Sequence, residues 1–278
     1  MEGLMEGLQV DHGRCVQCGQ CIISCNRRIL SADGSGFPFL PDENYEQCIA
    51  CGHCSAVCPA DALIAPKCGG EKAVPFPAAP DLDFDTAKKF LLSCRSMRLF
   101  KQETVKKDAI LDLLDVARKA PSAGNLQTIS WKILNGKEKT REFTALTMEW
   151  FDKELRHNPE FSARYNIDNM LERHRNGDDP ILRGACNAVI AVTDNTAVWG
   201  AVDGAIAITY FCLAAYGMNV GSCWCGFGMR ALQAYQPLRD LVGLDDSQTA
   251  HGMAFFGYPE LEYHALPPRK PLRADWVE

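Results

Sequence analysis

The sequence predicts an α+β protein in which a small cysteine-rich domain precedes a larger domain of layered helices and strands. Three observations lead to this prediction. Eight cysteines occur as two copies of one spacing before residue 60, a stretch rich in proline and glycine follows, and helical and strand patterns alternate beyond it. We therefore expect domains over residues 1–68 and 83–278, joined by a linker over residues 69–82.

Composition narrows the classes of function. The net charge of −6 lacks the basic surplus of a nucleic-acid-binding protein. No run of eighteen or more unbroken apolar residues occurs, so we expect no membrane span, and the first residues lack the basic and apolar regions of a signal peptide. We expect the fourteen cysteines to lie in a reducing cytoplasm, where thiols serve as ligands.

The first element along the chain is the cysteine repeat, C-x2-C-x2-C-x3-C. The first copy consists of Cys15, Cys18, Cys21 and Cys25, and the second of Cys48, Cys51, Cys54 and Cys58. Three thiolates two residues apart can surround three irons of a cubane where the backbone turns tightly, and a glycine after the second cysteine allows that turn. Zinc ligands come as separated pairs with longer gaps, so the spacing favours iron–sulfur clusters over zinc.

This repeat resembles a bacterial two-[4Fe–4S] ferredoxin over residues 10–68. The resemblance implies crossed ligation, with one cluster on Cys15, Cys18, Cys21 and Cys58 and the other on Cys48, Cys51, Cys54 and Cys25. Asn26 stands where the family usually has proline, which concerns the turn and not the ligands. Residues 31–41 suggest a hairpin between the two halves, and Cys68, outside the repeat, is interpreted as a bystander.

Beyond the linker, periodicity predicts helices and strands in alternation. We expect helices over residues 85–93, 141–175 and 201–216. A further helix should follow Thr104 as its N-cap, with an apolar face from Val105 to Ala117, and end at Ala120-Pro121. We expect strands over residues 131–134, 188–193 and 253–257. The helix over residues 201–216 is almost entirely apolar, so it should be buried, possible sites being the core or a subunit interface.

Four short motifs follow one another in this second part. They are Arg95-Ser96-Met97-Arg98-Leu99-Phe100, residues 120–127, residues 217–224, and Gly257-Tyr258-Pro259 with Arg269-Lys270-Pro271-Leu272. Guanidinium and hydroxyl groups such as those of the first motif suit a phosphate, and the amide and hydroxyl side chains of the second can pair with the polar edge of a flavin ring. In this order they resemble the nitroreductase family of FMN enzymes, over residues 85–278.

The resemblance implies a three-layer α/β/α domain that binds FMN between two protomers of a homodimer. The cofactor contacts that it implies are Arg95, Ser96, Arg98, Pro121, Ser122, Asn125, Gln127, Ser222, Cys223, Trp224, Arg269 and Lys270. The sequence departs from the family at Cys94, where an arginine is common, and at Thr128, where a proline is common. These departures indicate a divergent subgroup whose substrate is not inherited.

Several other residues leave two readings open. Cys223 and Cys225 are either a redox-active pair or packed core thiols, and the C-x-C spacing favours packing. Asp203 interrupts the apolar helix, and a buried carboxylate there needs partners. The aromatic residues Trp150, Phe151, Phe161 and Tyr165 either line a substrate lid or pack beneath a loop.

These features lead to a functional hypothesis. Electrons enter through two [4Fe–4S] clusters, reduce FMN, and pass to a small organic acceptor such as a nitroaromatic, enone or quinone. Because the flavin carries out the redox chemistry in such enzymes, we name no catalytic acid or base. One alternative keeps NAD(P)H as the donor and uses the clusters as an exit to an external electron-transfer protein. Another is a non-enzymatic electron carrier or redox sensor.

Overall fold

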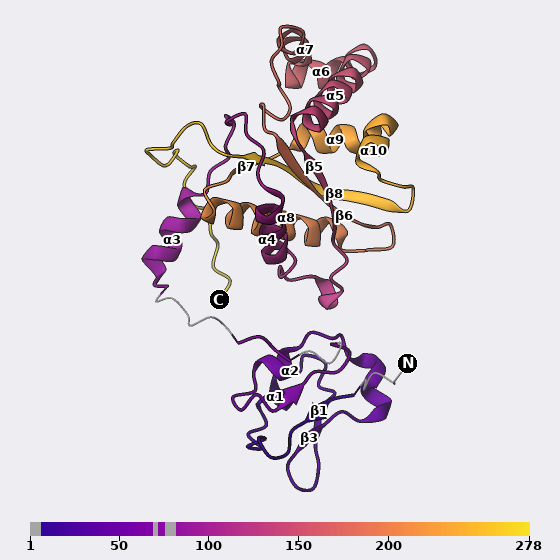
Figure 1. Ribbon diagram of the computed structural model, residues 1–278, viewed down its shortest axis with the longest axis vertical. Coiled ribbons are helices and arrows are strands. Elements are labelled where there is room, and N and C mark those ends of the chain that lie inside the picture. The colour runs from indigo at the N-terminus through magenta and orange to yellow at the C-terminus, as the bar shows by residue number, and fades with distance from the viewer. Residues whose placement is uncertain (1–6, 69–71, 76–81) are drawn as a thin grey trace. The chain divides into compact units, whose positions relative to one another are not determined.

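The computed structural model describes residues 7–68, 72–75 and 82–278, so most of the expected linker lies outside the described residues. The chain divides into two compact units (Figure 1). The first consists of residues 1–82 with residues 124–126, and the second of residues 83–123 with residues 127–278.

The small unit contains two antiparallel strand pairs and short helices. Strand β1 (Gln9–Val10) pairs with β4 (Leu63–Ile64), and β2 (Ser31–Ala32) pairs with β3 (Pro38–Phe39). The expected hairpin over residues 31–41 is thus confirmed. The carboxylate of Asp33 stabilises its turn by accepting hydrogen bonds from the backbone N–H groups of Ser35 and Phe37, each at 2.9 Å.

The internal repeat of the sequence is also a repeat of structure. Helix α1 (Gln20–Ser24) and helix α2 (His53–Ala56) each begin directly after a glycine in the left-handed conformation, Gly19 at φ 71° and Gly52 at φ 70°. A side chain at either position would strain the backbone, so glycine is what allows the chain to turn into the helix immediately after the second cysteine of each copy. A 3-10 helix, η1 (Asp42–Gln47), precedes the second copy.

The larger unit is built on one four-stranded sheet in which every neighbouring pair is antiparallel. The strand order is β5 (Ser130–Asn135), β6 (Asn187–Asp194), β8 (Gln248–Gly257) and β7 (Gly221–Trp224). The three expected strands are confirmed, β8 being five residues longer at its start than the range 253–257. Strand β7 was not predicted, and its residues fall in the third of the four motifs.

Helices cover both faces of this sheet, which confirms the three-layer arrangement (Figure 1). Helices α4 (Lys107–Ala117) and α8 (Gly200–Gly217) pack on Val189, Ala191, Ala254 and Phe256. The opposite face carries α5 (Lys137–His157), α6 (Pro159–Tyr165), α7 (Ile167–Arg175), α9 (Gly226–Ala234) and α10 (Gln236–Val242). Helix α3 (Phe84–Ser93) begins the unit. Successive residues of β6 and β8 therefore serve two separate cores, as the alternation of a strand requires.

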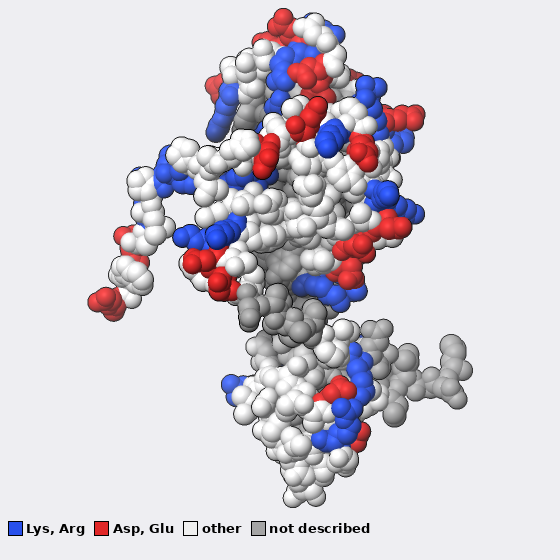
Figure 2. Space-filling model, turned by 60° about the vertical axis from the view of Figure 1, so that its left-hand side comes forward, with Lys and Arg blue, Asp and Glu red and all other residues white. Residues whose placement is uncertain are grey.

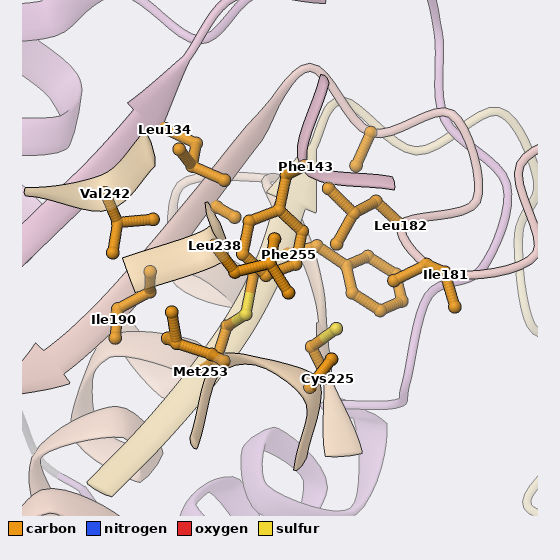
Figure 3. Packing of buried hydrophobic residues seen from close by; sticks show 14 of the residues in the cluster. Leu134, Phe143, Ile181, Leu182, Ile190, Cys225, Leu238, Val242, Met253 and Phe255 are labelled. Atoms are coloured by element: carbon orange, nitrogen blue, oxygen red, sulfur yellow. The ribbon is translucent and has the colours of Figure 1, made fainter. Parts of the chain in front are cut away.

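Side chains interlock in the core between the sheet and helices α5, α6, α7, α9 and α10. Figure 3 shows Phe143 from α5 and Leu182 from a loop lying over Phe255 of β8, with Cys225 and Ile181 beside them. Phe143 and Leu182 are fully buried. Burying a side chain of this size contributes about 1.5–3 kcal/mol each, so this layer fixes the helices on which a site can be built.

Two expected helix boundaries are wrong. Helix α4 begins at Lys107, with Lys106 as its N-cap, and not at Thr104. The chain that leads into α4 is held instead by a hydrogen bond: the N–H of Val105 donates to Oδ1 of buried Asn187 at 2.9 Å. The stretch 141–175 is three helices, because Asn158 caps α6 by accepting the N–H of Phe161, and Asn166 adopts the left-handed conformation.

Helix α8 is apolar enough, and long enough, to pass a test of length and hydropathy for a membrane span. It nevertheless packs against β6 and β8, with Ile208, Phe211 and Ala215 fully buried. Asp203, 4 % exposed, has the partner that its burial demands, since its Oδ1 accepts the N–H of Ala123 at 3.0 Å. The helix is therefore a core element of this unit.

Charge is mixed on the surface. On the face drawn in Figure 2, Lys and Arg side chains are interspersed with Asp and Glu over both units, and a broad uncharged band crosses the larger one. Such a face offers no single-sign field for steering a polyanion.

An extended segment, residues 95–101, joins the sheet at the β7 edge. Ser96 forms a parallel bridge with Ser222, and the N–H of Met97 donates to the carbonyl of Ser222 at 2.9 Å. Phe100 bridges Pro259, and the N–H of Lys101 donates to the carbonyl of Tyr258 at 2.9 Å. The approach is close: a Cβ on Gly221 would lie 2.7 Å from Cγ of Met97.

This close approach gives a stability test. We expect Gly221→Ala to destabilise the larger unit by about 1–3 kcal/mol, because Met97 is buried and has no room to retreat. The matched control is Gly217→Ala, in the same motif but exposed at the end of α8, where the nearest atom to an added Cβ is 3.9 Å away. Thermal unfolding followed by circular dichroism measures both. Equal melting temperatures for the two variants would contradict the packing described.

Candidate functional site

The eight repeat cysteines of the small unit line two separate cavities. One is lined by Cys15, Cys18, Cys21 and Cys58, and the other by Cys25, Cys48, Cys51 and Cys54. Each cavity thus collects three cysteines from one copy of the repeat and the fourth from the other copy. These are the two sets that the ferredoxin resemblance implies.

The crossing follows from the two short helices. Helices α1 and α2 lie against each other, Cys25 is the C-cap residue of α1, and Cys58 follows α2 by two residues. Each fourth cysteine is therefore carried along its helix toward the other half. Apolar residues complete the walls, among them Leu63 in the first cavity and Leu30 in the second, both buried. Such walls exclude water from whatever the thiols bind.

The arrangement suits a multi-atom cluster and not a single ion. Among the described residues, no three His, Cys, Asp or Glu side chains converge closely enough to hold one metal ion. The thiols instead surround a space, as ligands of a [4Fe–4S] cubane do. Burial raises the pKa of Cys54 to about 12 and also raises that of Cys21. Ligation by these thiols would therefore release protons as iron binds.

Cys68 lies near the second set without joining it. Its thiol donates to the carbonyl of Ala50 at 3.6 Å, and burial, together with Cys48 and Cys51, raises its pKa. It is not among the residues that line either cavity, in agreement with the bystander reading.

In the larger unit, the segment 95–101 separates two cavities. Arg95 and Met97 line a cavity of about 840 Å³, together with Lys101, Tyr216 and residues 259–266. Arg98 lines a second cavity of about 440 Å³, together with Cys223, Trp224 and Cys225 at the end of β7. Both volumes fall in the range of small-molecule sites. We call them the Arg95 cavity and the Arg98 cavity.

The predicted phosphate-binding residues are thus divided. The structure does not bring Arg95 and Arg98 into one cavity, because an extended segment directs residues an odd number apart to opposite sides. Ser96 lies between them at the bridge to Ser222. In the part of the chain that the structure describes, the buried Nε of Arg95 has no hydrogen-bond partner. A buried guanidinium nitrogen without a partner beside a cavity fits an anionic group such as a phosphate.

The loop 120–127 is wound tightly by its own residues. The hydroxyl of Ser122 accepts the N–H of Gln127 at 3.0 Å, and Asn125 and Gln127 both have positive φ values, 56° and 49°. Pro121 and Gln127 are exposed. The loop is anchored to the core by the bond from Ala123 to Asp203. It therefore holds polar side chains in a fixed loop, as a binding element requires.

Arg269 and Lys270 lie apart from these elements. They belong to the exposed segment 261–278, which has no helix or strand, and they line neither the Arg95 cavity nor the Arg98 cavity. The contact of these two residues with a phosphate stays a prediction.

Cys223 and Cys225 face the Arg98 cavity from positions two apart, and both are buried. Burial raises the pKa of Cys225 to about 12, so its thiol stays protonated near neutral pH and is a poor nucleophile. Its sulfur lies among Phe143, Phe255 and Ile181 (Figure 3). This environment favours the packing reading for Cys225 over a redox role.

The aromatic residues left open by the sequence pack together, and two of them line a cavity. Trp150, Phe151 and Phe161 are buried in one cluster with ring centroids 5.0–6.3 Å apart. Phe161 and Tyr165 also line the Arg98 cavity. Two further residues of that cavity, Arg183 and Arg230, were not singled out by the sequence. They are 47 positions apart, in a loop and on α9, and no local pattern connects them.

The fold and these cavities define a two-domain protein. A small domain with two four-cysteine cavities is joined to a three-layer α/β/α domain whose cavities are lined by arginines. Residues 14–62 match the family described as 4Fe-4S dicluster domain, and residues 91–258 match the nitroreductase family. The chain belongs to the nitroreductase family. A search of curated proteins finds no match to it.

Solved structures share the fold of the larger unit. A nitroreductase with bound FMN from Bacteroides fragilis aligns with a TM-score of 0.54 and 19 % identity, over 69 % of this chain and 96 % of that one. A nitroreductase with bound FMN from Desulfitobacterium hafniense gives 0.55 and 20 %, over 69 % and 97 %. Oxidised iodotyrosine deiodinase bound to FMN and 3-iodo-L-tyrosine gives 0.54 and 18 %, over 69 % and 98 %.

The shared cavities give a test of the ligand sets. If each cavity holds one cluster, Cys15→Ala and Cys58→Ala each lower the iron content by about four atoms per chain, and the double variant lowers it no further. Cys15→Ala with Cys25→Ala, which affects both cavities, should remove about eight. Iron and acid-labile sulfide are measured after anaerobic assembly.

The control for this test is Cys68→Ala, which should keep its iron because that thiol lines neither cavity. Additive losses in the Cys15 and Cys58 pair would show that these cysteines serve different clusters.

Proposed function

We propose that this chain is an FMN-dependent oxidoreductase that takes up electrons at two [4Fe–4S] clusters and delivers them to a small organic acceptor such as a nitroaromatic, enone or quinone. The observation that supports this most directly is the pair of four-cysteine cavities within one chain of the nitroreductase family. A domain that holds two [4Fe–4S] clusters can serve a flavin enzyme as a supply of single electrons.

FMN, when bound, supplies the chemistry that joins one-electron clusters to a two-electron acceptor. The protein's part is to bind and orient it. Arg95 offers a guanidinium group for its phosphate, and Arg98 offers one to the cofactor from the other side of the segment 95–101. Ser122, Asn125 and Gln127 offer hydroxyl and amide groups for the polar edge of its ring. The backbone of Ser222, Cys223 and Trp224 is fixed by its pairing with β8, and Cys223 and Trp224 line the same cavity as Arg98.

The chain's own residues also keep the site dry. The Arg98 cavity is closed on one side by buried Phe161 and Phe255. Apolar walls of this kind limit the access of water, which would otherwise compete with the acceptor for protons and hydrogen bonds. The thiol of Cys225, neutral because of its burial, adds no charge there.

The direction of electron flow decides between this proposal and its rivals. Potentials of iron–sulfur clusters span about −700 to +450 mV, and values at the low end of this range favour the clusters as an entrance. A nicotinamide-fed enzyme would use them as an exit, and an electron carrier would show no turnover of a small acceptor.

The deciding experiment is stopped-flow mixing of the anaerobically assembled protein with reduced ferredoxin, NADH or NADPH. We expect the flavin absorbance to bleach with reduced ferredoxin, and at least about tenfold more slowly in a Cys15→Ala or Cys25→Ala variant, since each should lack one cluster. Dithionite serves as the control, because it should bleach the flavin of every variant. Prompt bleaching by NAD(P)H at the same rate in the cysteine variants would reject the clusters as the entrance.

We also propose that the chain forms a homodimer with two flavins and four clusters. Large apolar side chains are exposed on three helices of the larger unit: Leu91 of α3, Leu111 and Val116 of α4, and Tyr210 of α8 are 39–53 % exposed. Exposed apolar residues gathered on neighbouring elements are typical of an interface.

Light scattering tests the dimer. We expect Leu111→Asp to produce monomers and to release FMN, because a charge placed in an apolar interface must be desolvated. Val74→Asp is the control, since Val74 is 89 % exposed in the small unit. A wild-type monomer that retains a full complement of FMN would contradict both the dimer and a shared flavin site.

A further inference from the structure

The Arg98 cavity combines an aromatic wall with an excess of positive charge. Three of its residues are arginines, Arg98, Arg183 and Arg230, and none is an aspartate or glutamate. We propose that this cavity selects planar acceptors that carry a carboxylate, with Arg183 and Arg230 as specificity-determining residues. The inference rests on the proposed function and deepens it by naming the class of substrate.

The wall suits a planar molecule. The ring of Phe161 lies 4.9 Å from that of Tyr165, and Tyr165 meets Phe227 edge-on at 5.6 Å. All three line the cavity, together with Trp224. Rings tilted against one another in this way present both faces and edges, which attract the ring of an aromatic or conjugated ligand.

Arg230 is held at this wall. Its Cζ lies 4.0 Å from the centroid of Phe161, a cation–π contact that orients the guanidinium on the cavity side of α9. Among the described residues it forms no ion pair with a carboxylate. The stacking leaves its N–H groups available for an acceptor.

The position of Arg183 is fixed through the backbone of its loop. Its backbone is left-handed, with φ at 58°, a conformation that costs a bulky residue roughly 1 kcal/mol or more and needs outside support. Asp179 supplies it: the carboxylate accepts the N–H groups of Ile181, Leu182 and Gly184 at 2.8–3.0 Å. The hydroxyl of Thr144 adds a fourth bond at 2.9 Å.

The Arg183 side chain has a carboxylate nearby, that of Asp178, whose pKa it helps to lower less than Arg173 does. The neighbouring Asp178 pairs with Arg173 instead, and within the described ranges Arg183 has no ion pair. Two guanidinium groups that form no ion pair within the described ranges therefore line one cavity. A neutral quinone or nitroarene can accept only hydrogen bonds from them, whereas a carboxylate also gains charge assistance and can bind a guanidinium group through two N–H groups. Arg98 is left to the cofactor, as predicted from the sequence.

Calorimetry of the oxidised holoprotein with benzoate and with benzamide tests the selection without requiring turnover. The two ligands share a planar ring, and only benzoate is charged. We expect benzoate to bind at least about tenfold more tightly, which corresponds to about 1.4 kcal/mol. In Arg183→Gln and Arg230→Gln this preference should shrink to less than about threefold, with the affinity for benzamide unchanged.

Arg118→Gln is the matched control, because Arg118 is exposed on α4 and pairs only with Asp115. Equal binding of the two ligands by the wild type, or no measurable binding of benzoate, overturns the inference. Loss of bound FMN from either cavity variant also overturns it, since the arginines would then hold the cofactor.

A kinetic arm separates this inference from the proposed function. The reduced protein is mixed with 4-nitrobenzoate or 4-nitrobenzamide, and reoxidation is followed. We expect a KM at least about tenfold lower for the acid, lost in the two variants. If both compounds reoxidise the protein with equal KM, the selection is overturned and the proposed function stands. If neither does, the proposed function fails, while calorimetry still decides whether the cavity selects a carboxylate.

Discussion

The sites of the larger unit depend on one constraint: β7 pairs with β8, and residues 95–101 pair with β7 and with Tyr258 and Pro259 just after β8. Through backbone hydrogen bonds to Ser222 and Tyr258, an extended segment from the start of the unit becomes part of the sheet edge. Its alternating side chains then open onto two different spaces. A chain that docked here one residue out of register would exchange the two sets of side chains. The register is protected by the tight fit of Met97 against Gly221.

The two units use opposite means to prepare their sites. In the small unit, ligands are specified by local spacing and by left-handed glycines, so a short stretch of chain suffices for most of each cavity. In the larger unit, the groups that line a cavity come from β7, α6, α9 and the loop before β6. Their relation exists only after the sheet and both helical layers have formed. Its precision therefore depends on the buried core shown in Figure 3.

This difference explains what the sequence could reveal. The cysteine sets were predictable because the repeat encodes them within two short segments. Helix α3 was predictable from the period of its apolar residues, and α8 from its almost entirely apolar composition. Strand β7 was missed because Gly-Ser-Cys-Trp has no alternating pattern, and it is a strand only through its partner β8. Arg183 and Arg230 were missed for a similar reason. Asp203 lay between these cases, since its burial required a partner but only the fold showed that Ala123 provides it.

The exchange of the fourth cysteine between the halves of the small unit has a consequence for its history and its assembly. Neither half encloses a complete set of thiols, since Cys25 completes the cavity of the second half and Cys58 that of the first. A chain interrupted between residues 25 and 48 would leave two incomplete sites, and neither fragment could mature alone. The two halves of the repeat thus depend on each other for their ligands. The smallest unit that can bind clusters, or be transferred to another protein, is the pair of halves.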